Sequence, residues 1–322
     1  TPKVKYRHLQ YDLTERRLFD EDRPSADSAL ASIDGGLYFE RKTQLFGEDL
    51  LHTLEPRIFY LYSEYEDQTD HPDFDSTELT FGYNQLFRET RFAGRDRLDD
   101  ANHAAIGVST RFIGDADGRE IASASLGQIF YFEDRKVRLR PTDQPQETSS
   151  SELAAELYFS PSDRCGLRGN LFWDPYSGKV NSGSIQTNYT DDKSRIFNLG
   201  YSYRRPIAGS RSAVTEQLHL SAWVPLQSNW SLFASWNYSI EAKTSIEDMV
   251  GLEYDTCCWT VRLLHLRYFD TVVGQIPDFN DPQLAREDAT QIQIRLKGMG
   301  GFGNRVTGLL EDMIRGFDER DY

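Results

Sequence analysis

Apolar and polar residues alternate with a period of two along most of this chain, in unusually long segments. Residues 229–240 (NWSLFASWNYSI) place Trp230, Leu232 and Trp236 on one face and small polar residues such as Ser235 on the other. Such segments run for about 10–13 residues, whereas strands of soluble domains usually have about 5–6. A tilted strand needs about 9–11 residues to cross a bilayer. The alternation therefore predicts strands of membrane-spanning length.

Fourteen segments carry this pattern and are predicted as strands. They are 2–13, 31–44, 51–65, 102–113, 119–132, 150–160, 163–174, 179–190, 194–205, 215–225, 229–240, 246–256, 258–269 and 287–297. Long connections alternate with tight ones such as GDADG at 114–118; the long ones are 14–30, 66–101, 133–149, 206–214 and 270–286. Bacterial outer-membrane barrels show this asymmetry, with short periplasmic turns and long external loops. We therefore expect an all-β, antiparallel transmembrane β-barrel whose apolar face meets lipid and whose polar face lines the lumen.

Two segments are set apart from the predicted strands. Residues 76–86 also alternate, but a strand there would break the order of long and short connections. The whole of 66–101 is therefore assigned as one long extracellular loop with room for a hairpin of its own. The barrel is expected to occupy 1–297. Residues 298–322 begin with GMGGFG and continue with the amphipathic VTGLLEDMIRGF, so we expect a helical or irregular periplasmic tail.

The composition agrees with a barrel and excludes other classes. A mean hydropathy of -0.60 is low, but only every second residue of a spanning strand faces lipid. The chain lacks a run of about 18 apolar residues, which excludes transmembrane helices. Aromatic residues make up 13%, and Tyr and Trp favour the membrane–water interface. The net charge of -15 argues against nucleic acid, whose phosphates are bound by Lys and Arg.

Candidates for catalysis are few. The histidines are scattered, and no GxSxG, HExxH or nucleotide-binding GxxxxGK[ST] motif occurs. His219 and His265 lie on predicted strands, where a polar lining residue is the simpler interpretation. Several tryptophans fall near strand ends, as interface or packing residues do: Trp223, Trp230, Trp236 and Trp259. We therefore expect neither an enzyme nor a bound cofactor.

The three cysteines are the most informative single residues. Cys257 and Cys258 are adjacent in a short connection, on the side assigned as periplasmic. They lack the CxxC or Cys/His neighbours of a metal site. Cys165 lies six predicted strands away, beyond the roughly 7 Å that a disulfide allows between Cα atoms. Two interpretations stay open: two reduced thiols in a turn, or bonds to cysteines outside this chain in an oxidising periplasm.

A charged segment, FAGRDRLDDAN at 92–102, falls within the predicted external loop. Its polar residues are Arg95, Asp96, Arg97, Asp99, Asp100 and Asn102. In one interpretation this loop folds over or into the lumen and contacts a partner or a sugar. In the other it is a solvated loop whose charges satisfy one another. The aspartate spacing lacks the EF-hand pattern of a calcium loop.

Five stretches, in order along most of the chain, resemble the C-terminal barrel of lipopolysaccharide (LPS)-assembly proteins, the LptD family. They are TLEPRIFYLYSEYEDQTDHPDFDS at 53–76, YNQLFRETRFAGRDRLDDANHAAIGVSTRF at 83–112, SLGQIFYFEDR at 125–135, RCGLRGNLFWD at 164–174 and GLEYDTCCWTVRL at 251–263. The resemblance implies a barrel of about 26 strands, of which this chain would be roughly the second half. It implies residence in the Gram-negative outer membrane, LPS as cargo and an LptE-like lipoprotein plug. A periplasmic N-terminal domain upstream of Thr1 would join the LPS-transport bridge.

The resemblance also assigns roles to particular residues. Cys257 and Cys258 match an adjacent pair that forms long-range disulfides with cysteines of the N-terminal domain. The strand at 287–297 matches the one that meets the first barrel strand at a lateral seam, through which acyl chains reach the membrane. Its central residues are Gln291, Ile292, Gln293, Ile294 and Arg295. A passive porin or receptor channel is the alternative, although it explains neither the cysteine pair nor the ordered matches.

Overall fold

The computed structural model describes most of the chain, in two compact units. The described residues are 1–13, 23–45, 47–140, 143, 146–206, 214–269, 286–297, 300–302 and 304–317. One unit comprises Thr1–Glu156 with Phe172–Lys179, and the other Leu157–Leu171 with Val180–Tyr322. None of the helices that the structure describes is long and apolar enough to cross a membrane.

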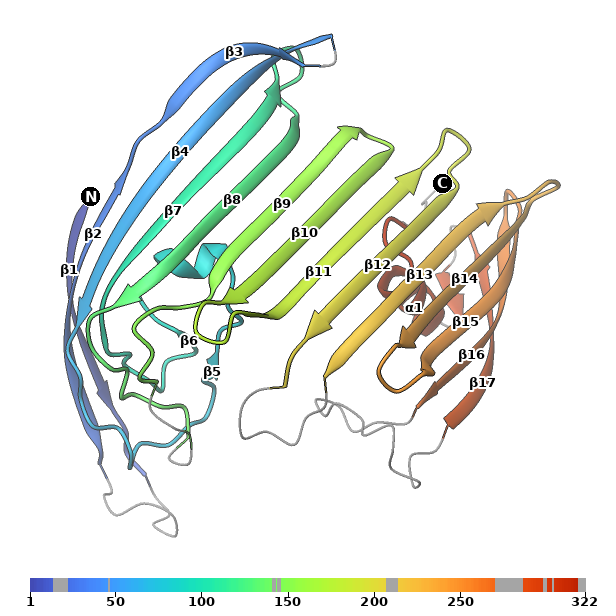
Figure 1. Ribbon diagram of the computed structural model, residues 1–322. Coiled ribbons are helices and arrows are strands. Elements are labelled where there is room, and N and C mark those ends of the chain that lie inside the picture. Colours follow the sequence, from blue (N-terminus) through green and yellow to red (C-terminus); the bar gives the residue numbers. More distant parts are fainter. Residues whose placement is uncertain are drawn as a thin grey trace. The chain divides into compact units, whose positions relative to one another are not determined.

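The first unit is an antiparallel sheet with a folded connection (Figure 1). Its strands are β1 (Pro2–Gln10), β2 (Ser25–Gly36), β3 (Phe39–Leu45), β4 (Glu48–Ser63), β7 (Ala101–Gly114) and β8 (Glu120–Tyr131). The order is β1-β2-β4-β7-β8, with β3 also paired to β4. Between β4 and β7 lie the short strands β5 (Thr77–Glu78) and β6 (Phe92–Ala93), which pair with each other, and the 3-10 helix η1 (Tyr83–Phe87).

The second unit is a larger antiparallel sheet with one helix. Its elements are β11 (Lys179–Thr190), β12 (Ile196–Arg204), β13 (Thr215–Pro225), β14 (Trp230–Ser239), β15 (Thr244–Asp255), β16 (Trp259–Phe269), β17 (Arg286–Leu296), β18 (Gly300–Phe302) and α1 (Asn304–Met313). Consecutive strands are neighbours throughout. The strands β9 (Leu153–Ser162) and β10 (Cys165–Asp174) are divided between the two units.

The expected all-β antiparallel fold is confirmed, with local corrections. Segment 215–225 coincides with β13 to the residue. The single strand expected at 31–44 is wrong: β2 and β3 pair consecutively along β4 and are separated at 37–38. The connection expected at 14–30 is also too long. Strand β2 already begins at Ser25, because Ala26 and Leu30 are buried on alternate positions despite the turn-forming Asp and Ser around them. Residues 14–22 lie outside the described ranges.

The two faces of each sheet reverse the pattern of a soluble protein. On β14, Trp230 and Leu232 are 44% and 40% exposed, whereas Ser231 and Ser235 of the other face are buried. Large apolar side chains such as Leu263 of β16 are exposed in the same way. Extended exposed apolar surface is unfavourable in water and marks a face that meets another apolar phase. The alternation in the sequence therefore predicted the faces correctly.

Both units bury part of their polar face under another segment. In the second unit α1 packs there, and its apolar residues join those of the strands. That core comprises Ile196, Trp223, Phe233, Met249, Leu264, Leu266, Val306, Leu310, Met313 and Ile314. Phe233 lies at a position that the alternation assigned to the polar face, and it is fully buried. The reason is α1, a segment distant in sequence that supplies apolar neighbours for it.

Candidate functional site

In the first unit, the connection between β4 and β7 docks on the polar face through a notch made by two glycines. Gly107 of β7 and Gly127 of β8 are directly opposite in the sheet. A Cβ atom at Gly107 would lie 2.7 Å from Phe87 Cζ and 2.8 Å from Tyr83 Oη, and one at Gly127 would lie 2.6 Å from Leu86 Cδ1. Interior atoms do not approach this closely, so η1 can seat only where side chains are absent.

The charged segment predicted at 92–102 continues this docked connection and is largely buried. Asp99 accepts hydrogen bonds from the backbone amide of Arg91 (2.6 Å) and from its guanidinium (2.7 Å). Asp100 accepts from the amides of Lys136 and Val137, at 2.7 and 3.0 Å. A buried carboxylate requires such partners, because desolvating it alone is costly. Asp100 thereby fixes the β8–β9 connection to the β4–β7 connection, and Asp99 holds Arg91 within the latter.

Arg97 and Asp96 complete this network through the backbone. The Arg97 guanidinium donates to the carbonyls of Pro72 (2.9 Å), Arg138 (3.1 Å) and Leu139 (2.9 Å). Asp96 accepts from the hydroxyl of Tyr11 (2.6 Å) and from the amides of residues 74 and 75 (both 2.7 Å). Burial raises the pKa of Asp96, but these hydrogen bonds outweigh it and hold the pKa below its usual value.

The remaining two members of the predicted loop set lie at its rim. Arg95 is exposed, and its amide donates to Asp75. Asn102 donates to Glu133 (2.8 Å) and accepts from the Tyr60 hydroxyl (3.0 Å). The charges of this loop therefore satisfy one another and the backbone, in a buried rather than a solvated setting.

The cysteine pair lies in the turn between β15 and β16. Both thiols are exposed, with their Sγ atoms 2.8 Å apart. The turn is closed by Thr256, whose Oγ1 accepts from the amide of Trp259 (3.1 Å). The neighbouring Cys257 thiol raises the pKa of Cys258. Within the described ranges no cluster of three potential metal ligands occurs. The pair is therefore accessible to an external thiol or disulfide.

Aromatic side chains flank this turn. The rings of Trp230 and Tyr254 are 4.8 Å apart, and those of Tyr254 and Trp259 are 5.4 Å apart. Tyr and Trp concentrate at membrane–water interfaces because an apolar body carries a polar tip. Trp223, which the sequence also placed near a strand end, is instead buried against Phe233.

The predicted seam strand is β17, and its residues divide between the two faces. Ile292 and Ile294 are exposed on the apolar face, Gln293 is buried on the polar face, and Gln291 and Arg295 are partly exposed. One edge of β17 pairs with β16 along the whole strand. The other edge pairs with β18 over Ile294–Leu296. Over the rest of that edge, the described part of the chain supplies no paired strand. The strand β18 is a feature that the Gly-rich sequence did not reveal.

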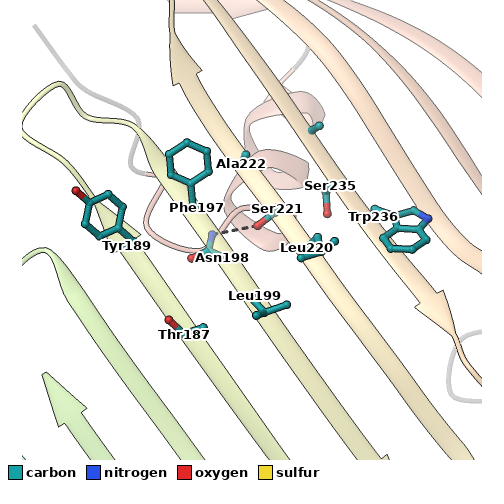
Figure 2. A pocket seen from close by; sticks show the side chains of 11 residues that line it. Thr187, Tyr189, Phe197, Asn198, Leu199, Leu220, Ser221, Ala222, Ser235 and Trp236 are labelled. Carbon is teal, nitrogen blue, oxygen red and sulfur yellow. Dashed lines mark hydrogen bonds between the residues drawn. The ribbon is translucent and has the colours of Figure 1, made fainter.

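The apolar face of the second unit carries a shallow groove of about 440 Å³ over β11–β14. Figure 2 shows Tyr189, Phe197, Leu199 and Trp236 standing around it, with the small side chain of Ala222 between them. The hydrogen bond from Asn198 to Ser221 (3.0 Å) belongs to the opposite face, where α1 lies. An apolar groove without convergent polar groups suits hydrocarbon and does not suit catalysis.

Comparisons with known proteins bear on this arrangement. The family model described as "LptD: LPS transport system D" matches residues 1–230. The LPS-assembly protein LptD of Nitrosococcus oceani is 35% identical over 99% of this chain and 41% of the relative. That of Saccharophagus degradans is 35% identical over 99% of this chain and 39% of the relative. The chain thus spans about two-fifths of the length of these relatives.

Among solved structures, the copper transporter OprC aligns with 91% of this chain and 52% of its own length. Its TM-score of 0.32 and identity of 10% are too low to indicate shared function.

Proposed function

This chain belongs to the LptD family of LPS-assembly proteins, and from that premise we propose that it forms part of a Gram-negative outer-membrane barrel that inserts LPS into the outer leaflet. The observation that carries the proposal is the reversed sheet, with exposed apolar side chains such as Leu263 on one face and buried polar ones such as Ser235 on the other. A spanning β-barrel requires this arrangement, because its outside meets lipid and its inside meets water. A soluble sandwich would bury the apolar face instead.

The two faces suggest separate routes for the two halves of the LPS molecule. The sugars and phosphates would cross along the polar face, and the acyl chains would leave through a seam beside β17 into lipid. The seam opens only if its strand pairing is weak, since each ladder hydrogen bond contributes on the order of 1 kcal/mol. The short pairing of β17 with β18 supports a weak edge. The work is binding and transport without covalent chemistry.

The same premise suggests the partners. An LptE-like lipoprotein would occupy the lumen of the full-length barrel, and the N-terminal domain would connect to the periplasmic LPS-transport bridge. The loop around Arg97 and Asp99 would close the lumen at its extracellular end, since its charges are already satisfied internally. The tail that holds α1 would lie at the periplasmic end.

Crosslinking tests the seam. In the full-length protein, Ile292→Cys paired with a cysteine in the first barrel strand should abolish LPS export when oxidised, and reduction should restore it. The matched control is Leu263→Cys with Ile292→Cys, because these residues are directly opposite in β16 and β17. That bond stays within the sheet and should leave export unchanged. Normal export from a fully crosslinked seam would exclude this route.

The role of the cysteine pair is tested by electrophoresis of the full-length protein. We propose that Cys257 and Cys258 bond to cysteines of the N-terminal domain. Reduction should then change mobility, each single Cys→Ser variant should retain one long-range bond, and the double variant should retain none. A passive porin, the alternative function, predicts identical mobility with and without reductant.

A further inference from the structure

A row of three polar side chains crosses the polar face at the end of the second unit. Glu253 of β15 is directly opposite Arg262 of β16, which is directly opposite Gln293 of β17. Arg262 Nε donates to Glu253 Oε2 at 2.6 Å, and Arg262 Nη1 donates to Gln293 Oε1 at 2.9 Å. All three residues are at most 7% exposed. The row therefore joins three strands through buried, charge-assisted hydrogen bonds.

The helix α1 closes this row through Thr307. Its Oγ1 accepts from Arg262 Nη1 and from Gln293 Nε2, each at 3.1 Å. The amide of Gln293 is thus bonded at both ends, to β16 by its oxygen and to α1 by its nitrogen. One turn further along, Leu310 is fully buried in the core that α1 shares with the strands. The helix is fixed by packing, and Thr307 transmits its position to β17.

We infer that Thr307 and Arg262 are positioning residues that hold the terminal strand β17 against β16, so that α1 acts as a latch on the strand beside which LPS would leave. The inference rests on the proposed function in that it takes β17 as the seam strand. If β17 swings away from β16, Gln293 must leave Thr307 and the buried guanidinium of Arg262. Buried polar groups that lose partners are penalised strongly. The latch therefore fixes β17 on β16, so that its opposite edge meets the first barrel strand in one position.

The position of Gln293 confines the effect of the latch to β17. Its neighbours Ile292 and Ile294 point to the exposed apolar face and away from α1. The hydrogen bond from Gln293 to Thr307 adds a side-chain link from β17 to α1. Just after α1, Arg315 contacts a distant strand instead, since its Nη1 donates to Gln186 Oε1 of β11 (2.8 Å). Removing the Thr307 hydroxyl should therefore loosen β17 and leave β11–β13 unchanged.

Hydrogen exchange of the full-length protein in its complex tests the latch. Thr307→Val, which keeps the shape and removes the hydroxyl, should speed amide exchange in β17 about fivefold, as expected for loss of one net hydrogen bond. Thr307→Ser should exchange like the wild type. Arg315→Ala, two residues after the end of α1, is the control and should leave β17 unchanged. Unchanged exchange in β17 for Thr307→Val, or equal acceleration in β12–β17, would overturn the inference.

Two further measurements keep the outcome decisive. Gln293→Leu removes the same bonds from the strand side and should reproduce the β17 acceleration if Thr307→Val fails to assemble. In the seam-cysteine background, Thr307→Val should also slow crosslinking of Ile292→Cys to the first strand. Exchange reports on the strand without LPS, whereas export from the crosslinked barrel reports on the route. A failed latch and a failed seam therefore give different results.

Discussion

The first unit covers its polar face with a folded connection rich in buried charge, whereas the second covers its own with the apolar side of α1. In the first, Asp99 and Asp100 are buried, pair with the partly buried Arg91 and accept from the backbone. In the second, residues such as Leu310 and Phe233 form an ordinary apolar core. The stability of the charged cover, the β4–β7 connection at 64–100, depends on every partner being present, because a buried charge left alone is penalised. The stability of the apolar cover, helix α1, depends on how completely its side chains fill the volume above the strands.

The two covers also differ in the sheet surface against which they pack. Gly107 and Gly127 leave a notch for η1, so the connection enters the sheet surface. The second unit instead places large side chains, such as Trp223 and Phe233, beneath α1. A notch accepts only one shape of the docked segment, since any added side-chain atom would collide. The notch suits a connection that keeps one position on the sheet. The apolar surface beneath α1 suits a helix that acts on the edge strand β17.

The largest expected effect is on the charged cover. Asp99→Ala removes the buried carboxylate that pairs with the partly buried Arg91 guanidinium and accepts from its amide, and should destabilise the docked connection by about 3–5 kcal/mol. Limited proteolysis of the full-length protein should then show new cleavage within 64–100, while α1 stays protected. The control is Asp12→Ala, whose pair with Arg23 is exposed on both sides and should contribute little. Equal cleavage at α1 would mean that the two covers are not independent.

A smaller effect is expected at the glycine notch. Gly107→Ala places a methyl group against Tyr83 and Phe87 and should cost about 1–3 kcal/mol. Protease sensitivity of 64–100 should rise, but less than in Asp99→Ala. Gly169→Ala is the matched strand control, because its Cβ would meet Ser184 O at an ordinary 3.5 Å. Equal sensitivity of the two glycine variants would show that the notch does not hold the connection.

Much of the strand pattern could be predicted because alternation is local. The faces of β14 follow directly from residues 230–239, and so does the exposure of Trp230. The break between β2 and β3 could not be predicted, since both halves have strand-like composition and only their partner β4 separates them. Predicted connections 206–214 and 270–286 lie mostly outside the described residues, as do 298–299, 303 and 318–322 of the predicted tail.

The candidate sites divide in the same way. The adjacency of Cys257 and Cys258 and their place in a turn are properties of the sequence, and the structure leaves both thiols exposed. The charged loop was singled out from 92–102, but its burial depends on Lys136 and Val137 of another connection. Arg262 was not singled out, because a lone arginine on a polar face carries no local signal.

By itself, the sequence determined most of the strands, the assignment of most side chains to a face and the cysteine turn, because each depends on residues within a few positions. Only the tertiary structure decided which segment covers which face. It also decided that Gly107 meets Gly127 and that Glu253, Arg262 and Gln293 stand in one row under Thr307. Those juxtapositions depend on register between strands and on the docking of a distant helix. Both are set by packing free energy summed over many residues, which no local pattern contains.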